Sequence, residues 1–150
     1  MDKQKILEIG LQMEKSARSF YEASAKLVAD PGAAHMLREL AVEEERHIQM
    51  FEDALAGKEV AFGKDAPEPG QDLKLGEVLE APSMTPTADA ADALIIAIKA
   101  EMRAIQFYSE SAKTLQGTET EEMMKGLVRE EQAHKAMLER LYDDEYLQDN

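Results

Sequence analysis

The sequence contains no cysteine and no tryptophan, and aromatic residues make up only 5% of its 150 positions. Without cysteine the chain cannot form disulfides, thiolate zinc sites, iron–sulfur clusters or cysteine nucleophiles. No segment approaches the run of ~20 apolar residues that a membrane-spanning helix needs, and the N-terminal segment MDKQKILEIGLQME has no apolar run suited to export. We therefore expect a soluble protein of the cytoplasm with no membrane partner.

Basic residues are scarce beside acidic ones, because 17 lysines and arginines compare with 31 aspartates and glutamates, for a formal net charge of −14. Affinity for nucleic acid depends largely on clustered lysine and arginine. The imbalance therefore argues against nucleic acid and anionic membranes as partners. A chain of 150 residues has the length of one ordinary domain with a single core, so we expect residues 1–150 to form one domain.

Apolar residues recur at spacings of three and four in four segments rich in Ala, Leu, Met, Glu and Lys, which predicts an all-α domain. The helices are expected from about Lys3 to Ala29, from Pro31 to about Ala56, from a cap at Thr87 or Asp89 to about Gln116, and from Thr118 into the acidic tail. Asp30 is the expected cap of the second helix, with Pro31 at its first position. The sequence TETE at Thr118–Glu121 has the pattern of a capping box.

A linker of about thirty residues, 57–86, separates the second and third helices and carries four of the five prolines. Loops of this length are uncommon in compact domains unless they have a function. A linker this long can run back along a helix of about 24 residues, roughly 36 Å at ~1.5 Å per residue, whereas two short turns make antiparallel hairpins. We therefore predict a four-helix bundle in the order up, down, down, up, with hairpins at about 3–57 and 87–146 and a crossover at about 58–86. The segment DLKLGEVLEA is expected to form a short helix over the bundle.

The chain contains an internal repeat, because a shift of 87 positions aligns the second hairpin with the first without a gap. The shift aligns Glu14 with Glu101, Phe20 and Tyr21 with Phe107 and Tyr108, Glu44 with Glu131, and His47 with His134. One hairpin is too thin to bury its apolar face alone. Two copies packed together make a four-helix bundle with approximate two-fold symmetry.

Ionisable residues interrupt the inward apolar stripe of each helix near its middle. Glu14 and Glu101 lie alone in their stripes, whereas the second and fourth helices each carry Glu-x-x-His, at Glu44 to His47 and at Glu131 to His134. Glu14 lies sixteen residues before Asp30 and His47 sixteen after Pro31, so antiparallel packing brings them to similar heights. All six groups can therefore converge in the middle of the bundle.

Four carboxylates and two imidazoles in an apolar bundle would be strongly destabilising as bare charges. Two divalent cations supply the missing four positive charges. Oxygen-rich ligation with one nitrogen for each ion suits iron or manganese better than zinc. One Glu from each of two helices and Glu-x-x-His from each of the others is the pattern of di-iron and di-manganese carboxylate bundles.

Some neighbouring residues have other interpretations. Spacing alone does not exclude Glu43 and Glu130 as ligands, because they also lie on apolar stripes. His35 has no counterpart in the repeat and is expected at the surface, and Arg46 and Lys135 are expected on solvated faces.

With the motif E-x-x-A-x-x-F-Y twice, E-E-x-x-H twice and the long crossover, the chain resembles the rubrerythrin-like branch of the ferritin-like superfamily over almost its whole length. The resemblance implies a ferritin-like fold and a dinuclear iron site, with manganese, mixed iron and manganese, or zinc as alternative occupants. The implied metal ligands are Glu14, Glu44, His47, Glu101, Glu131 and His134. It favours Glu44 and Glu131 over Glu43 and Glu130, and it implies that Tyr21 and Tyr108 hydrogen bond to ligand carboxylates.

The resemblance also implies an activity, reduction of hydrogen peroxide or dioxygen in the defence against oxidative stress, and a homodimer that can exchange hairpins. The chain departs from the rubrerythrin pattern in two ways. Rubrerythrins carry an extra carboxylate one turn after the third-helix glutamate, where this chain has Ala104. A C-terminal rubredoxin domain would need cysteines, and this sequence has none. We therefore expect a symmetric set of six ligands and an external electron donor such as a rubredoxin-like protein. The alternatives are an iron-binding, ferroxidase-like module and a bundle in which metal only stabilises the fold.

Overall fold

The computed structural model describes residues 1–58, 60, 71–80 and 89–147, and the part of the chain that it describes contains helices and no strand. Four long helices form the bundle: α1 (Lys3–Leu27), α2 (Pro31–Leu55), α4 (Ala90–Thr114) and α5 (Glu119–Tyr142). The short helix α3 (Leu75–Val78) lies outside them, and a π-helical turn at Asp143–Leu147 follows α5. None of the helices in the described ranges is long and apolar enough to cross a membrane.

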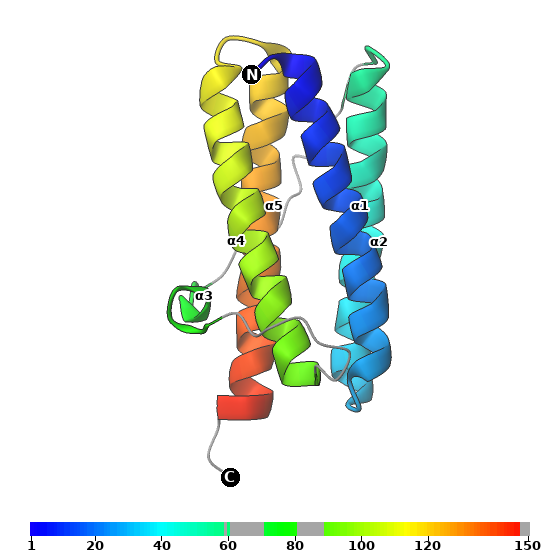
Figure 1. The fold of residues 1–150 in the computed structure, drawn as a ribbon, viewed down its shortest axis with the longest axis vertical. Coiled ribbons are helices and arrows are strands. Elements are labelled where there is room, and N and C mark those ends of the chain that lie inside the picture. Colours follow the sequence, from blue (N-terminus) through cyan, green and yellow to red (C-terminus); the bar gives the residue numbers. More distant parts are fainter. Residues whose placement is uncertain (59, 61–70, 81–88, 148–150) are drawn as a thin grey trace.

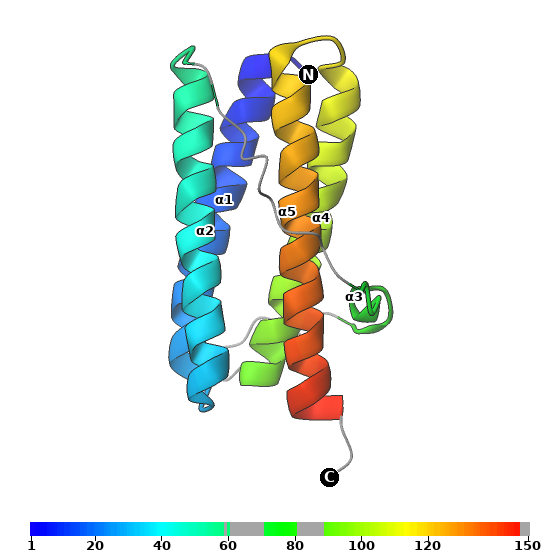
Figure 2. The same cartoon turned by 180° about the vertical axis from the view of Figure 1, so that it is seen from behind.

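The helices are arranged as two antiparallel hairpins packed side by side, α1 with α2 and α4 with α5 (Figure 1). Helix α1 also contacts α4, and α2 contacts α5, so that each helix has two neighbours (Figures 1 and 2). Helices α2 and α4 run in the same direction, although they follow one another in the chain (Figure 1). The predicted all-α bundle with the order up, down, down, up is therefore confirmed.

Local capping explains where three of the long helices begin. The carboxylate of Asp30 accepts a hydrogen bond of 2.8 Å from Ala33 N at the start of α2. Asp89 caps α4 by the same contact, at 2.9 Å from Asp92 N, and the alternative cap, Thr87, lies outside the described residues. Asp2 caps α1, which ends at Leu27, two residues earlier than predicted.

The capping box predicted at the start of α5 does not form, because neither the Thr118 hydroxyl nor the Glu121 carboxylate accepts the hydrogen bond that the motif requires. The Thr118 hydroxyl donates to the Leu115 carbonyl at 2.7 Å and makes no side-chain bond to the helix. The Glu121 carboxylate accepts a bond of 2.9 Å from Gly117 N, one residue before the cap. Gly117 has a φ of +85°, which turns its N–H toward that carboxylate, and this conformation favours glycine. Gly117 therefore supplies the backbone N–H that, in a capping box, Thr118 would donate to Glu121.

Helix α3 confirms the short helix predicted in the crossover, and it lies against α4 and α5. Gly76 is buried, and a Cβ there would lie 2.5 Å from Met102 Sδ and 2.7 Å from Ile98 Cγ2. Its N–H donates to Glu139 at 2.8 Å. Only glycine lets the crossover come this close to α4.

Lys135 was expected on a solvated face, and that expectation is wrong. The residue is 5% exposed. Its ammonium lies 3.1 Å from Asp72, 3.3 Å from Glu77 and 3.0 Å from Glu139. Asp72 and Glu77 belong to the crossover, so these contacts fasten that segment to α5 and cover the lysine.

The apolar core is divided into two clusters at opposite ends of the bundle. One cluster includes Leu37, Leu40, Leu94, Ile98 and Leu138, and the other includes Ile6, Leu7, Phe51, Met124 and Leu127. In the chain order of every helix, the buried carboxylates and histidines near the middle of the helix lie between the two clusters, whereas the buried Glu139 lies beside Leu138 in the first cluster. The two clusters therefore hold the four helices together on both sides of a polar layer, which would otherwise destabilise the bundle.

Candidate metal centre

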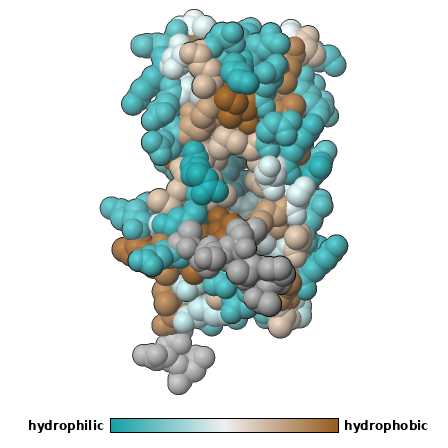
Figure 3. Space-filling view, viewed as in Figure 1, coloured by the Kyte–Doolittle hydropathy of each residue, from teal (hydrophilic) through white to brown (hydrophobic). Residues whose placement is uncertain are grey.

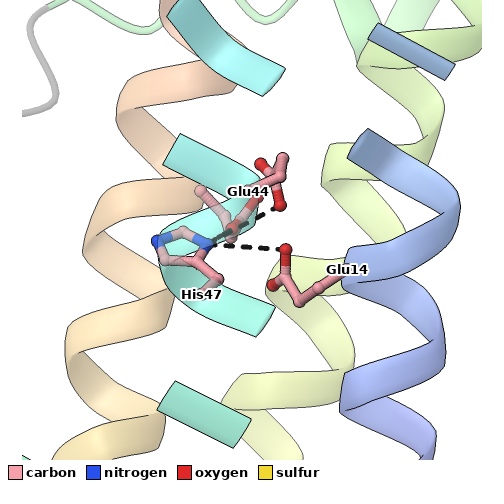
Figure 4. Close-up of side chains that lie close together, drawn as sticks. Glu14, Glu44 and His47 are labelled. Carbon is pink, nitrogen blue, oxygen red and sulfur yellow. Dashed lines mark ion pairs between the residues drawn. The ribbon is translucent and has the colours of Figure 1, made fainter. Parts of the chain in front are cut away.

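The structure brings together all six residues expected as metal ligands, at the middle of the bundle. Glu14 comes from α1, Glu101 from α4, Glu44 and His47 from α2, and Glu131 and His134 from α5. All are buried, with relative exposures from 0% for Glu44 and His47 to 5% for His134. Figure 4 shows one part of this arrangement, with the His47 ring directed toward Glu14 and Glu44.

The six side chains form two overlapping groups. One contains Glu14, Glu44, His47 and Glu131, and the other contains Glu44, Glu101, Glu131 and His134. Within each group one ligand atom from every residue lies within 4.8 Å of the others. Glu44 and Glu131 belong to both groups, so each of these carboxylates could contact two ions.

Most of the atoms that face one another in this centre have no hydrogen-bond partner. In the described ranges, the buried side-chain atoms without a partner are Glu44 Oε1 and Oε2, His47 Nδ1, Glu101 Oε2, Glu131 Oε1, His134 Nδ1 and Glu139 Oε1. All but the last belong to the centre. Buried polar atoms are almost always paired in folded proteins. Unpaired oxygen and nitrogen atoms that converge from four helices therefore fit metal ions, which accept several such donors at once.

Each histidine directs Nδ1 into the centre. His47 Nδ1 lies 3.4 Å from Glu14 and 3.1 Å from Glu131, and His134 Nδ1 lies 3.1 Å from Glu44. The two rings are nearly parallel, with centroids 5.9 Å apart. Glu and His three residues apart lie on one face of a helix, which explains why both members of each Glu-x-x-His motif reach the same place.

Two tyrosines hold carboxylates of the centre, each across the interface between the hairpins. The Tyr108 hydroxyl, from the second hairpin, donates to Glu14 Oε1 at 2.7 Å. The Tyr21 hydroxyl, from the first hairpin, donates to Glu101 Oε1. Burial raises the pKa of both hydroxyls, and nearby carboxylates raise it further, so both keep the proton that they donate.

The centre holds protons tightly when it has no other positive charge. Burial and the neighbouring Glu131 raise the pKa of Glu101 to about 8. Burial alone would lower the pKa of His47 and His134, but attraction to the surrounding carboxylates outweighs it, and both pKa values lie well above the usual range. The direction of these changes follows from four carboxylates sharing a low-dielectric space.

Glu43 and Glu130, the alternatives that spacing left open, lie on the outer side of the centre. Glu130 Oε2 is 2.8 Å from His47 Nε2, the nitrogen that faces away from the shared carboxylates. The Glu43 side chain is 46% exposed and pairs with Arg46. Arg46 also pairs with Glu130. This contact was not predicted from the sequence, although the chain offers one signal for it: the repeat places Ala133 where the first hairpin has Arg46.

A cavity of about 750 Å³ lies between α1 and α4 and reaches the centre. Most of its wall is apolar, including Ile9, Met13, Ala17, Phe20, Ile96, Ala100 and Ala104. Glu14, Glu101 and Glu131 also line it. Figure 3 shows this face of the molecule, hollowed between the two helices with apolar surface beside the hollow. Small molecules in solution therefore have a route to the buried carboxylates.

Comparisons with known proteins agree with this architecture. The model of a family described as a ferritin-like domain matches residues 2–144. A solved structure, described as hypothetical protein Pfu-1136390-001 from Pyrococcus furiosus, is similar in fold, with a TM-score of 0.71 and 24% sequence identity. The similarity covers 95% of this chain and 89% of that one. No curated protein matches the sequence.

Proposed function

The chain belongs to the ferritin-like domain family, and from that premise we propose that it is a rubrerythrin-like di-iron oxidoreductase. It reduces hydrogen peroxide, or dioxygen, with electrons from an external donor. The observation that carries the proposal is the pair of buried four-residue groups that share Glu44 and Glu131. An isolated acidic cluster would not support it, because exposed acidic groups are common without a metal ion.

Charge and ligand type favour two iron ions. Four carboxylates carry four negative charges, which two divalent cations neutralise, and each group offers one histidine nitrogen among carboxylate oxygens. Such ligands suit iron or manganese, so manganese, a mixed pair and zinc remain alternative occupants. Two ferrous ions in these positions would supply one electron each and act as Lewis acids toward the oxidant.

The protein itself would position the ligand carboxylates, shield the centre from bulk water and admit the oxidant. Tyr21 and Tyr108 fix the orientation of Glu101 and Glu14, so that these carboxylates are in place before an ion binds. The apolar clusters on both sides of the centre exclude bulk water. The cavity between α1 and α4 admits an oxidant as small as peroxide and leads to three carboxylates of the centre.

The 150 residues contain no cysteine that could hold a rubredoxin-type iron. A separate rubredoxin-like protein is the donor that we propose. We further propose that the protein works in the cytoplasm as a homodimer, with exchange of hairpins across the crossover as one form of that dimer.

Rapid mixing of the anaerobic, iron-loaded protein with peroxide tests the proposal. We expect two irons per chain and oxidation of the ferrous protein far faster than that of free ferrous ion. The variant Glu131→Ala, which removes a shared carboxylate, should bind less iron and lose the fast phase. Oxidation no faster than that of the free ion would overturn the enzyme proposal.

Two other outcomes would identify the alternatives. Fast oxidation by dioxygen, with iron retained as mineral in an assembly far larger than a dimer, would identify a ferroxidase-like storage module. Tightly retained zinc that raises stability, without any reaction with peroxide, would identify a structural metal.

A further inference from the structure

The two halves of the centre differ on the outer side of the histidines. His47 makes contacts through both ring nitrogens: Nδ1 faces the shared carboxylates, and Nε2 lies 2.8 Å from Glu130 Oε2. The Glu130 side chain is 7% exposed and comes from α5, opposite the helix that carries His47. A carboxylate in this position accepts the Nε2–H proton and leaves Nδ1 free to bind an ion.

His134 has no such contact. All of its carboxylate contacts in the described part of the chain are made through Nδ1, at 3.1 Å from Glu44, 3.7 Å from Glu101 and 3.6 Å from Glu131. The repeat gives Glu43 as the counterpart of Glu130. The Glu43 carboxylate instead lies 3.0 Å from Arg46 on its own helix.

Arg46 accounts for the difference. Its guanidinium pairs with Glu43 and with Glu130 Oε1, which leaves Glu130 Oε2 for His47. Its repeat counterpart is Ala133, which carries no charge, so this position supplies no equivalent cation on the His134 side. Glu43, His47 and Glu130 are also close enough to hold an ion, but in this group the Arg46 guanidinium already supplies a positive charge.

We propose that Glu130 and Arg46 are positioning residues that make the two metal positions unequal, with the ion beside His47 held more tightly than the ion beside His134. The inference rests on the proposed metal centre. A carboxylate that accepts the outer N–H of a ligating histidine fixes its tautomer and ring orientation and increases its basicity, and loss of such a partner typically reduces metal affinity about 10–100-fold. Among the residues that the structure describes, only His47 has this partner, so the two ions should bind in sequence.

Titration of the metal-free protein with cobalt(II) alone, followed by its visible absorption, tests the inference. Wild type should bind two ions in two resolved steps. Glu130→Gln, which keeps the shape and a weaker acceptor, should weaken the first step about 10–100-fold and the second far less. Arg46→Gln should weaken the same step by a smaller factor, because Glu130 remains. Glu43→Gln is the matched control, since it removes a carboxylate that also contacts Arg46, and it should leave both steps unchanged.

Proton NMR of the cobalt-loaded protein gives a second reading that a general loss of stability would not produce. With one ion bound, a single slowly exchanging histidine N–H signal should appear at a hyperfine-shifted position, and in Glu130→Gln this proton should exchange faster. Two ions bound with equal affinity by wild type, or equal weakening of both steps in Glu130→Gln, would overturn the inference and leave the metal centre standing. No cobalt bound by wild type would overturn the metal centre and this inference with it.

Discussion

Replacement of Glu44 by leucine should have opposite effects on stability with and without metal. Glu44 is fully buried, and neither carboxylate oxygen has a hydrogen-bond partner. It also belongs to both groups of residues that could hold a metal ion. Without metal, the side chain adds a fourth buried carboxylate to a site that already contains three. With metal, it is one of the two side chains that could contact both ions.

The size of the effect follows from these contacts. Leaving a buried polar group without a partner costs about 1–3 kcal/mol. Like-charged carboxylates that share a buried site also repel one another, so that removing one of them relieves this repulsion. Glu44→Leu should therefore raise the free energy of unfolding of the metal-free protein by about 1–3 kcal/mol, which raises Tm by roughly 2–4 °C for each kcal/mol in a chain of this size. Metal at 100 times its Kd stabilises wild type by about 2.7 kcal/mol for each ion, and the variant should lose most of this.

Thermal unfolding followed by circular dichroism, once with chelator and once with excess cobalt(II), measures both effects. The variant should unfold above wild type in chelator and below it in cobalt(II). Glu45→Leu, on the same helix but with a side chain that is 59% exposed, should change Tm little and respond to cobalt(II) as wild type does. A variant that is less stable than wild type in chelator, or that gains as much from cobalt(II), would refute the reasoning.

Three further predictions follow from the structure. In the metal-free protein Tm should fall as pH rises from about 5 to 9. The unfolded chain releases the Glu101 proton near its ordinary pKa of 4.5, whereas the folded protein keeps it to about 8, and the raised pKa values of the two buried histidines act in the same direction. A rise in Tm over this range would contradict the prediction. Tyr21→Phe should keep the helical circular dichroism but lower cobalt(II) affinity by about 10–100-fold, because Glu101 loses its donor, and an unchanged titration would show that the hydroxyl is dispensable. Gly10→Ala should lower the free energy of unfolding in urea by about 1–3 kcal/mol, because a Cβ there would lie 2.3 Å from Phe51 Cε1. Adding Phe51→Leu should restore it, since the repeat counterparts of these two residues are alanine and leucine, and a double variant as unstable as the single one would contradict the pairing.

The residues of the centre could be predicted from sequence because the relevant information is local. A helix repeats every 3.6 residues, so the apolar stripes around Glu14 and Glu101 identify their faces without knowledge of the partner helices. The shift of 87 positions and the long crossover then determined the order and direction of the four helices. For Glu-x-x-His, a spacing of three places both side chains on one face whatever they contact.

Other features depend on which helices pack together and on how far each helix is shifted along its axis relative to its neighbours. Spacing within one helix does not predict these features. Glu43 and Glu44 differ by one position, and both follow apolar spacing, but packing buries Glu44 and leaves the Glu43 side chain 46% exposed. Tyr21 lies two turns from Glu14 on its own helix, yet its hydroxyl reaches Glu101 on α4. Spacing along a chain describes neighbours within a helix and not those across an interface.

By itself, then, the sequence determined the helices, their order and the inward faces that carry six ionisable residues, because these follow from periodicity and from the repeat. The tertiary structure alone decided that Lys135 is buried, that Glu130 contacts His47, and that Arg46 makes the two halves unequal. The contacts of Lys135 with Asp72 and Glu77, and those of Glu130 with His47 and Arg46, join residues more than fifty positions apart. Their formation depends on the packing of whole helices, since charged side chains become buried only where the fold supplies partners of opposite charge.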